Sequence, residues 1–176
     1  KYIDLNWVYQ LINYAVWKLA GPSGLILLNS AFFIGAVYVT LSHVRTNIGW
    51  LIPWILLMSI LAISPSLEVR PHSVSWFLLA LVIRQLQLFS KGNIKALRWV
   101  PLVLLIWVNM HSLFILGLLV FGIYWAGTWM NRKEHFKQAS LYFGVSILDC
   151  LINPYGLSGL LFPFEQATAL ESGNIF

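Results

Sequence analysis

The residues best suited to chemistry lie in four separate parts of a largely apolar chain. They are Asp4, Arg70, His72, Asn109, His111, Asn153 and Tyr155. Polar and ionisable side chains in apolar surroundings are costly unless they line a cavity or find partners, so these residues are candidates for a functional site. Such a site forms only if the surrounding helices bring the four parts together.

Arg70 and His72 are suited to bind a phosphate or pyrophosphate group. A guanidinium group has a planar fork of N–H donors that matches phosphate oxygens, and an imidazole ring adds a further donor. An ordinary polar loop between two helices explains these two residues equally well. His111 is suited to bind an anionic head group or to assist proton transfer, although a lone histidine more often has a structural role. The remaining candidates for substrate binding are Asn109, Asn153 and Tyr155.

Asp4 is the candidate for a catalytic residue. It could act as a general base or as a metal ligand at a membrane surface, but an aspartate before a helix is also a common cap. The sequence alone favours the cap. Asp149 and Arg84 stand inside apolar runs, where a structural ion pair is favoured over a proton-carrying role. The sequence contains no cluster of metal-ligating residues, no glycine-rich phosphate loop and no redox motif.

The composition indicates an integral membrane protein. Hydrophobic residues make up 59% of the chain and charged residues 10%, whereas a soluble domain has about 25% charged residues. The net charge of +5 comes mainly from short loops between apolar runs, as in cytoplasmic membrane loops, and this argues against nucleic acid as a partner. The single cysteine, Cys150, stands in an apolar run and is expected to be a small buried residue.

The chain is expected to form a single transmembrane unit over residues 1–176. Residues 1–20 have the pattern of an amphipathic interfacial helix that is too short to span a bilayer. Residues 24–164 are expected to hold the membrane helices and the segments at the outer face. The expected spans are residues 25–42, 48–64, 73–89 and 138–152, and residues 159–164 are expected to form another interfacial segment.

Residues 99–130 form an apolar stretch that is too long for one crossing. As a single helix it would be about 48 Å long at 1.5 Å per residue, against a hydrocarbon core of about 30 Å. Basic residues flank it at 91–98 and 132–137, and if both groups are cytoplasmic the stretch must enter the membrane and return. Polar residues at 109–112 mark the expected break. The predicted fold is therefore an all-α polytopic transmembrane bundle with interfacial amphipathic helices and a broken helical hairpin.

This topology brings all four parts of the chain to one face of the membrane. The turn after residue 64, the break at 109–112 and the turn at 153–156 lie on the side opposite the basic loops, which makes them extracytoplasmic. The residues expected to converge there are Asp4, Arg70, His72, His111 and Asn153.

Four motifs, taken in order, resemble a group of bacterial multi-spanning membrane proteins. They are Asp4-Leu5-Asn6-Trp7-Val8-Tyr9-Gln10, Arg70-Pro71-His72-Ser73, Trp107-Val108-Asn109-Met110-His111-Ser112-Leu113-Phe114 and Asn153-Pro154-Tyr155-Gly156. The set resembles GT-C-type glycosyltransferases and covers nearly the whole chain.

The resemblance implies a sugar donor linked to polyprenyl phosphate and an active site on the extracytoplasmic side of a bacterial inner membrane. It also implies an acidic general base in the first outer loop, often with a divalent metal ion nearby. Asp4 is the acidic residue of that loop here, and Arg70 and His111 would stabilise the departing phosphate. Asn6 stands where the motif commonly has an acidic residue. The first span of that family is absent, so we expect the chain to be part of a longer protein.

Two other functions stay open. A non-catalytic subunit of a larger membrane complex would keep this scaffold and pack its apolar surface against other subunits, and Asn6 favours this alternative. A transporter would also contain broken helices and polar residues at membrane depth, but the sequence lacks the paired halves that such folds usually reveal. Membrane lipid is an expected partner of the chain under all three functions.

Overall fold

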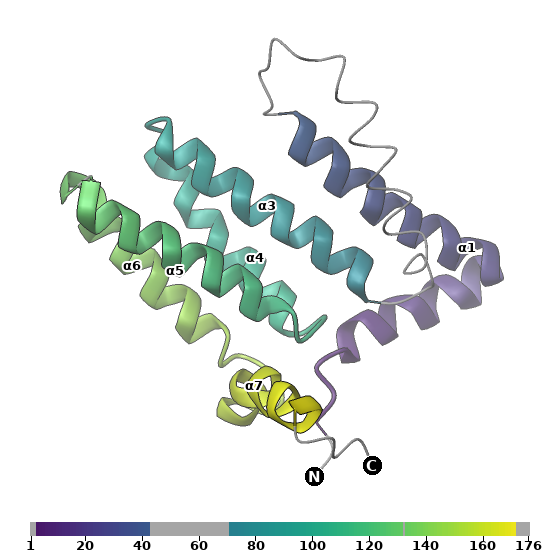
Figure 1. Ribbon diagram of the computed structural model, residues 1–176. Helices are drawn as coiled ribbons and strands as arrows, with labels where there is room; N and C mark the ends of the chain where they lie inside the picture. The colour runs from purple at the N-terminus through teal and green to yellow at the C-terminus, as the bar shows by residue number, and fades with distance from the viewer. Residues whose placement is uncertain (1–2, 43–70, 132, 172–176) are drawn as a thin grey trace.

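The regular structure of the described chain is entirely helical, which confirms the expected all-α class. The computed structural model describes residues 3–42, 71–131 and 133–171 (Figure 1). Two of its helices, α1 (Trp7–Leu41) and α3 (His72–Ser90), are long and apolar enough to cross a membrane, and they point to membrane association. The expected span at 48–64 and the turn that follows it lie outside the described residues.

Helix α1 is bent into two arms at Gly21. This residue has a φ of 62° and a ψ of −158°, a conformation that glycine adopts at little cost. Pro22 follows it, and a proline lacks the backbone N–H that would continue the helical ladder. Figure 1 shows the arm before Gly21 running across the lower end of the other helices and the arm after it running beside α3. The bend lies between the interfacial helix expected at 1–20 and the span expected at 25–42, so the boundary between these two segments is confirmed.

A buried amide joins the two arms of α1 to α3. The Oδ1 atom of Asn29 accepts hydrogen bonds from the Tyr9 hydroxyl at 2.9 Å and from the Ser73 hydroxyl at 2.6 Å. Its Nδ2 atom donates to the Leu25 carbonyl at 3.0 Å. Tyr9 lies on the first arm and Asn29 on the second, so these bonds help to fix the angle of the bend.

The long apolar stretch breaks where the sequence predicted. A short 3-10 helix, η3 (Ile94–Arg98), leads into α4 (Trp99–Val108), and α5 (Phe114–Asn131) follows after a turn. The two helices pack closely, because a Cβ atom on Gly117 would lie 2.7 Å from the Trp107 ring. Trp107, Phe114 and Phe121 are fully buried in the shared core.

Two helices in the C-terminal part of the chain have bounds that differ from the expected ones. Helix α6 (Lys133–Asp149) already begins within the segment expected to be a basic loop, since Lys, Glu and Gln are strong helix formers that continue a helix outside its apolar part. It ends at Asp149, three residues before the expected end. Helix α7 (Leu157–Glu171) is longer than the expected segment at 159–164 and includes Pro163.

Cysteine labelling of intact cells tests whether these helices cross a membrane. In a Cys150→Ala background, we expect Lys91→Cys to react with a membrane-impermeant maleimide only after permeabilisation. Ser158→Cys is expected to react from outside the cell. Both positions are exposed. Lys91 directly follows α3, and Ser158 belongs to α7, which Figure 1 shows near the opposite ends of the helices. Labelling of both positions from the same side would contradict the predicted topology.

Candidate functional site at one end of the helices

Four segments that are distant in sequence meet at one end of the helices, which we call the polar end. They are the start of α1, the start of α3, the α4–α5 turn and the α6–α7 turn. The Val8 amide donates to the Asn109 carbonyl at 3.2 Å, and the His72 and His111 ring centroids are 5.0 Å apart. The expected convergence is thus present for Asp4, His72, His111 and Asn153, while Arg70 lies outside the described residues.

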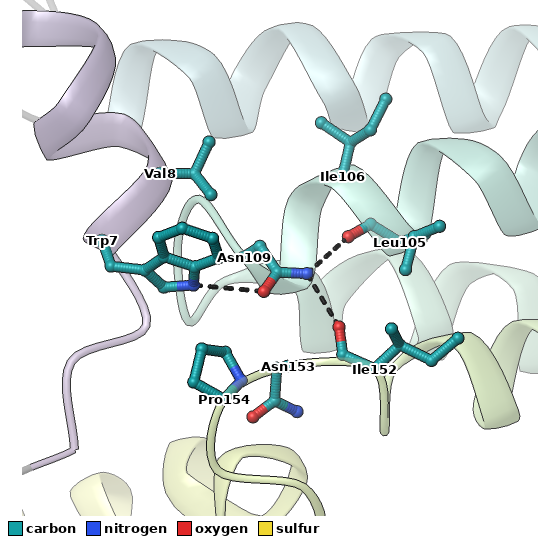
Figure 2. Close-up of a pocket in the computed structure, with 8 residues that line it drawn as sticks. All are labelled: Trp7, Val8, Leu105, Ile106, Asn109, Ile152, Asn153 and Pro154. Atoms are coloured by element: carbon teal, nitrogen blue, oxygen red, sulfur yellow. Dashed lines mark hydrogen bonds between the residues drawn. The ribbon is translucent and has the colours of Figure 1, made fainter.

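Asn109 forms the central junction of the polar end (Figure 2). Its Oδ1 atom accepts a hydrogen bond from Trp7 Nε1 at 3.1 Å. Its Nδ2 atom donates to the Leu105 carbonyl at 3.0 Å and to the Ile152 carbonyl at 2.9 Å. Both N–H donors are therefore used within the protein. The amide ties α1, α4 and the segment after α6 together, so its observed role is structural.

His111 lies in the α4–α5 turn, between the ends of two helices, and is buried. Its Nδ1 atom is 2.9 Å from the Ser75 hydroxyl oxygen, which in turn accepts a hydrogen bond from Trp107 Nε1 at 3.0 Å. Burial, and to a lesser degree the nearby His72, lowers the pKa of His111 from 6.5 to about 4. The His111 ring is therefore neutral at physiological pH, whereas the His72 side chain is exposed.

Asp4 organises the start of α1. One carboxylate oxygen accepts a hydrogen bond from the Asn6 amide at 2.9 Å, and the other accepts one from Gln10 Nε2 at 2.9 Å. The N-cap of α1 is Asn6, and no side chain caps the helix, so the expectation that Asp4 is the cap was wrong. Asp4 instead closes a turn just before the helix through the Asn6 amide. No group of three or more His, Cys, Asp or Glu side chains in the described part of the chain is placed to hold a metal ion. The described surroundings of Asp4 therefore supply no set of three such ligands for the divalent metal ion that the family resemblance implied.

Asn153 organises the turn between α6 and α7. Its Oδ1 atom accepts a hydrogen bond from the Tyr155 amide at 2.8 Å, and its Nδ2 atom donates to the carbonyls of Cys150 and Gly156. Gly156 has a φ of 55°, which lets the chain reverse without strain. Asn153 thus joins the end of one helix to the start of the next, and the partly buried Tyr155 packs against the main core.

The expected ion pair between Asp149 and Arg84 does not form. Asp149 ends α6 near the polar end, whereas Arg84 lies twelve residues after His72, about 18 Å along α3 at 1.5 Å per residue. Within the described ranges, no hydrogen-bond partner reaches the buried Arg84 Nε atom. The expectation was wrong because sequence hydropathy places residues in helices but does not fix their relative depth.

An apolar groove of about 510 Å³ opens beside Asn109. Figure 2 shows that its walls come from the first arm of α1, from α4 and from the segment that follows α6. Its lining residues are Trp7, Val8, Leu105, Ile106, Asn109, Ile152, Asn153 and Pro154. Two of the predicted site residues, Asn109 and Asn153, thus line one groove.

The sequence analysis missed three residues that shape this end of the protein. Ser75 and Trp107 contact His111, and Asn29 joins α1 to α3. The role of Asn29 could have been predicted from the sequence, because it is an isolated amide in an apolar span and such side chains commonly form hydrogen bonds between helices. Ser75 stands three residues after His72, and this spacing places them on neighbouring positions of one helix face. A serine hydroxyl alone gives too weak a signal to show that role.

Comparison with known proteins gives no relative: no family model, curated protein or solved structure matches the chain.

Gly159→Ala tests the close contact between α7 and the Asn153 turn. A Cβ atom at this position would overlap the Asn153 amide group, so we expect a loss of about 1–3 kcal/mol in unfolding free energy. Gly144→Ala is the matched control, because a Cβ atom there meets nothing within 4 Å and alanine favours the helix by up to about 1 kcal/mol. Thermal unfolding in detergent measures both. Equal stability of the two variants would contradict the contact.

The pH dependence of stability tests the buried state of His111. Its pKa of about 4 lies below the ordinary 6.5, so the unfolded chain binds the proton more readily than the folded protein does. Stability should therefore be greatest above about pH 6.5 and should fall by about 3 kcal/mol in total as the pH drops through about 4. His111→Asn removes this titration, and its unfolding midpoint should change less over the same range. Identical pH profiles would refute the assignment.

Proposed function

We propose that this chain is a polytopic GT-C-like glycosyltransferase of a bacterial inner membrane. It would transfer a sugar from a polyprenyl-phosphate donor to an acceptor on the extracytoplasmic side. The observation that carries the proposal is the apolar groove at the polar end, whose wall from Trp7 and Val8 belongs to the segment that follows Asp4. Such a surface would suit a hydrocarbon chain.

The groove suits part of an isoprenoid chain. Apart from the amides of Asn109 and Asn153, its lining is aliphatic or aromatic or, at Pro154, a proline ring. Its volume of about 510 Å³ lies within the range of about 300–1,000 Å³ that is usual for small-molecule sites. Both N–H groups of the Asn109 amide are bonded within the protein, so this residue presents no unsatisfied donor to an apolar ligand.

The charge distribution supports an extracytoplasmic position for the polar end. Lys91, Lys95 and Arg98 are exposed where α3 ends and η3 follows, at the end of α3 opposite His72. Basic residues beside a membrane span favour the cytoplasm. A sugar donor bound at the polar end would therefore have its head group outside.

In the proposed reaction, an acceptor hydroxyl oxygen attacks the anomeric carbon of the donor, and the bond from that carbon to the phosphate oxygen breaks. Asp4 would accept the proton from the acceptor. Arg70 and His72 would stabilise the negative charge of the departing polyprenyl phosphate. Each carboxylate oxygen of Asp4 accepts one hydrogen bond in the structure, and a carboxylate oxygen has a second lone pair that can accept a hydrogen bond from the acceptor hydroxyl.

A second function, a non-catalytic subunit of a membrane complex, is favoured by a different observation. The amides of Asn109 and Asn153 donate both of their N–H groups within the chain, and each oxygen of Asp4 already accepts one hydrogen bond. Such a polar end would stabilise the scaffold, while the apolar sides of the helices would pack against other membrane subunits.

Asp4→Asn separates these two functions. Asparagine keeps an oxygen that can accept the Asn6 amide hydrogen, but it loses the charge and the basicity needed to accept a proton. If the chain is an enzyme, we expect sugar transfer by the protein in liposomes to fall at least 100-fold, the lower end of the usual contribution of a general base of about 10²–10⁴. Arg70→Ala should cause a similar loss, with membrane insertion unchanged in both variants.

Gln10→Ala is the control for the lost hydrogen bond. It removes the partner of the second Asp4 oxygen without changing the carboxylate, so it should retain most of the transfer activity. Full activity in both Asp4→Asn and Arg70→Ala would refute the enzymatic proposal. Transfer that falls equally in Gln10→Ala and Asp4→Asn would show that the bond matters and not the charge.

A further inference from the structure

Three side chains form a hydrogen-bonded chain in the protein interior beside the polar end. It runs from Trp107 through Ser75 to His111, with donor–acceptor distances of 3.0 Å and 2.9 Å. Trp107 is fully buried, Ser75 is 3% exposed and His111 is 7% exposed. Water therefore has little access to the two hydrogen bonds between these groups, and their direction is set by the protein.

The chemistry of the three groups gives the chain one direction. An indole nitrogen only donates, so the Ser75 oxygen accepts the hydrogen from Trp107. The serine hydroxyl has a single hydrogen of its own, which it can direct to the lone pair of His111 Nδ1. In the reverse arrangement, Nδ1 would carry a hydrogen and would donate it to Ser75.

A backbone group argues against the reverse arrangement. The Leu113 amide also points its hydrogen at His111 Nδ1, with an N to N distance of 3.4 Å. A protonated Nδ1 would put two hydrogens against each other, whereas a lone pair accepts from both Ser75 and Leu113. Since the buried ring is neutral, its single hydrogen must then be on Nε2.

We propose that Ser75 and Trp107 are positioning residues that hold His111 as the Nε2–H tautomer, so that it offers a fixed neutral N–H donor at the polar end. A ring in this state binds an acceptor atom, such as an oxygen of a phosphate or a hydroxyl group. It is unsuited to bind a metal ion, because the lone pair on Nδ1 is occupied and Nε2 has none available.

This inference deepens the proposed function and assigns His111 one task within it. If a polyprenyl phosphate binds at the polar end, His111 donates a hydrogen bond to it and does not remove a proton from the acceptor. The general base would then be Asp4. The tautomer itself does not depend on the identity of the substrate, so it can be measured without a sugar donor.

Nitrogen NMR of the protein in lipid nanodiscs tests the proposal. With ¹⁵N-labelled histidine, a protonated and an unprotonated ring nitrogen have well-separated chemical shifts, and His111→Asn identifies the signals of this residue. We expect the wild-type protein at pH 7 to show His111 with Nδ1 unprotonated and Nε2 protonated. In Ser75→Ala, a Nδ1–H population should appear, because only the longer Leu113 contact still favours the lone pair.

Ser146→Ala is the matched control. Ser146 is also buried, and its hydroxyl has no hydrogen-bond partner in the described ranges, so this variant makes the same truncation elsewhere in the core. It should keep the wild-type His111 signals. A wild-type spectrum with Nδ1 protonated would overturn the proposal, and so would a Ser75→Ala spectrum identical to the wild type.

The outcome is independent of the transfer assay. If His111 has the expected tautomer but Asp4→Asn retains full sugar transfer, the glycosyltransferase proposal fails while the positioning role of Ser75 stands. If transfer depends on Asp4 but the NMR signals show Nδ1–H in His111, the positioning role fails alone.

Discussion

The main constraint on this structure is that helix ends expose backbone carbonyl groups which need partners where apolar helices meet. Asn109 meets this constraint at the polar end. Its side chain donates to the carbonyls of Leu105 and Ile152, and its own carbonyl accepts from the Val8 amide. One amide residue thus joins three segments of the chain. The same three segments line the groove.

The same constraint explains why polar residues of the site also have structural roles. Asp4, Asn153 and Ser75 each form hydrogen bonds that shape a helix start, a turn or a buried contact. In an apolar protein, few polar side chains are available for either purpose. A polar residue that binds substrate here would therefore also form hydrogen bonds with the backbone or with a neighbouring side chain. Substitutions at the polar end need controls that separate the loss of binding from the loss of these hydrogen bonds.

The sequence was informative about positions along the helices and less so about contacts between them. The bend near Gly21 and the break at 109–112 were predictable, since glycine, proline and a cluster of polar residues interrupt apolar runs. The start of α6 was not, because the charged residues before its apolar part are good helix formers. The absence of an Asp149–Arg84 pair and the role of Ser75 both depend on relative depth, which a hydropathy pattern does not contain.

The bend in α1 has a mechanical consequence for the groove. Trp7 forms part of one wall and belongs to the first arm, while the wall from Leu105 and Ile106 belongs to α4. A rotation of the first arm about a hinge at Gly21 would move one wall of the groove relative to the other. The hydrogen bonds from Tyr9 and Ser73 to Asn29 would restrain this rotation. A change in the width of the opening would therefore involve the buried Asn29 amide as well as the bonds from Trp7 and Val8 to Asn109.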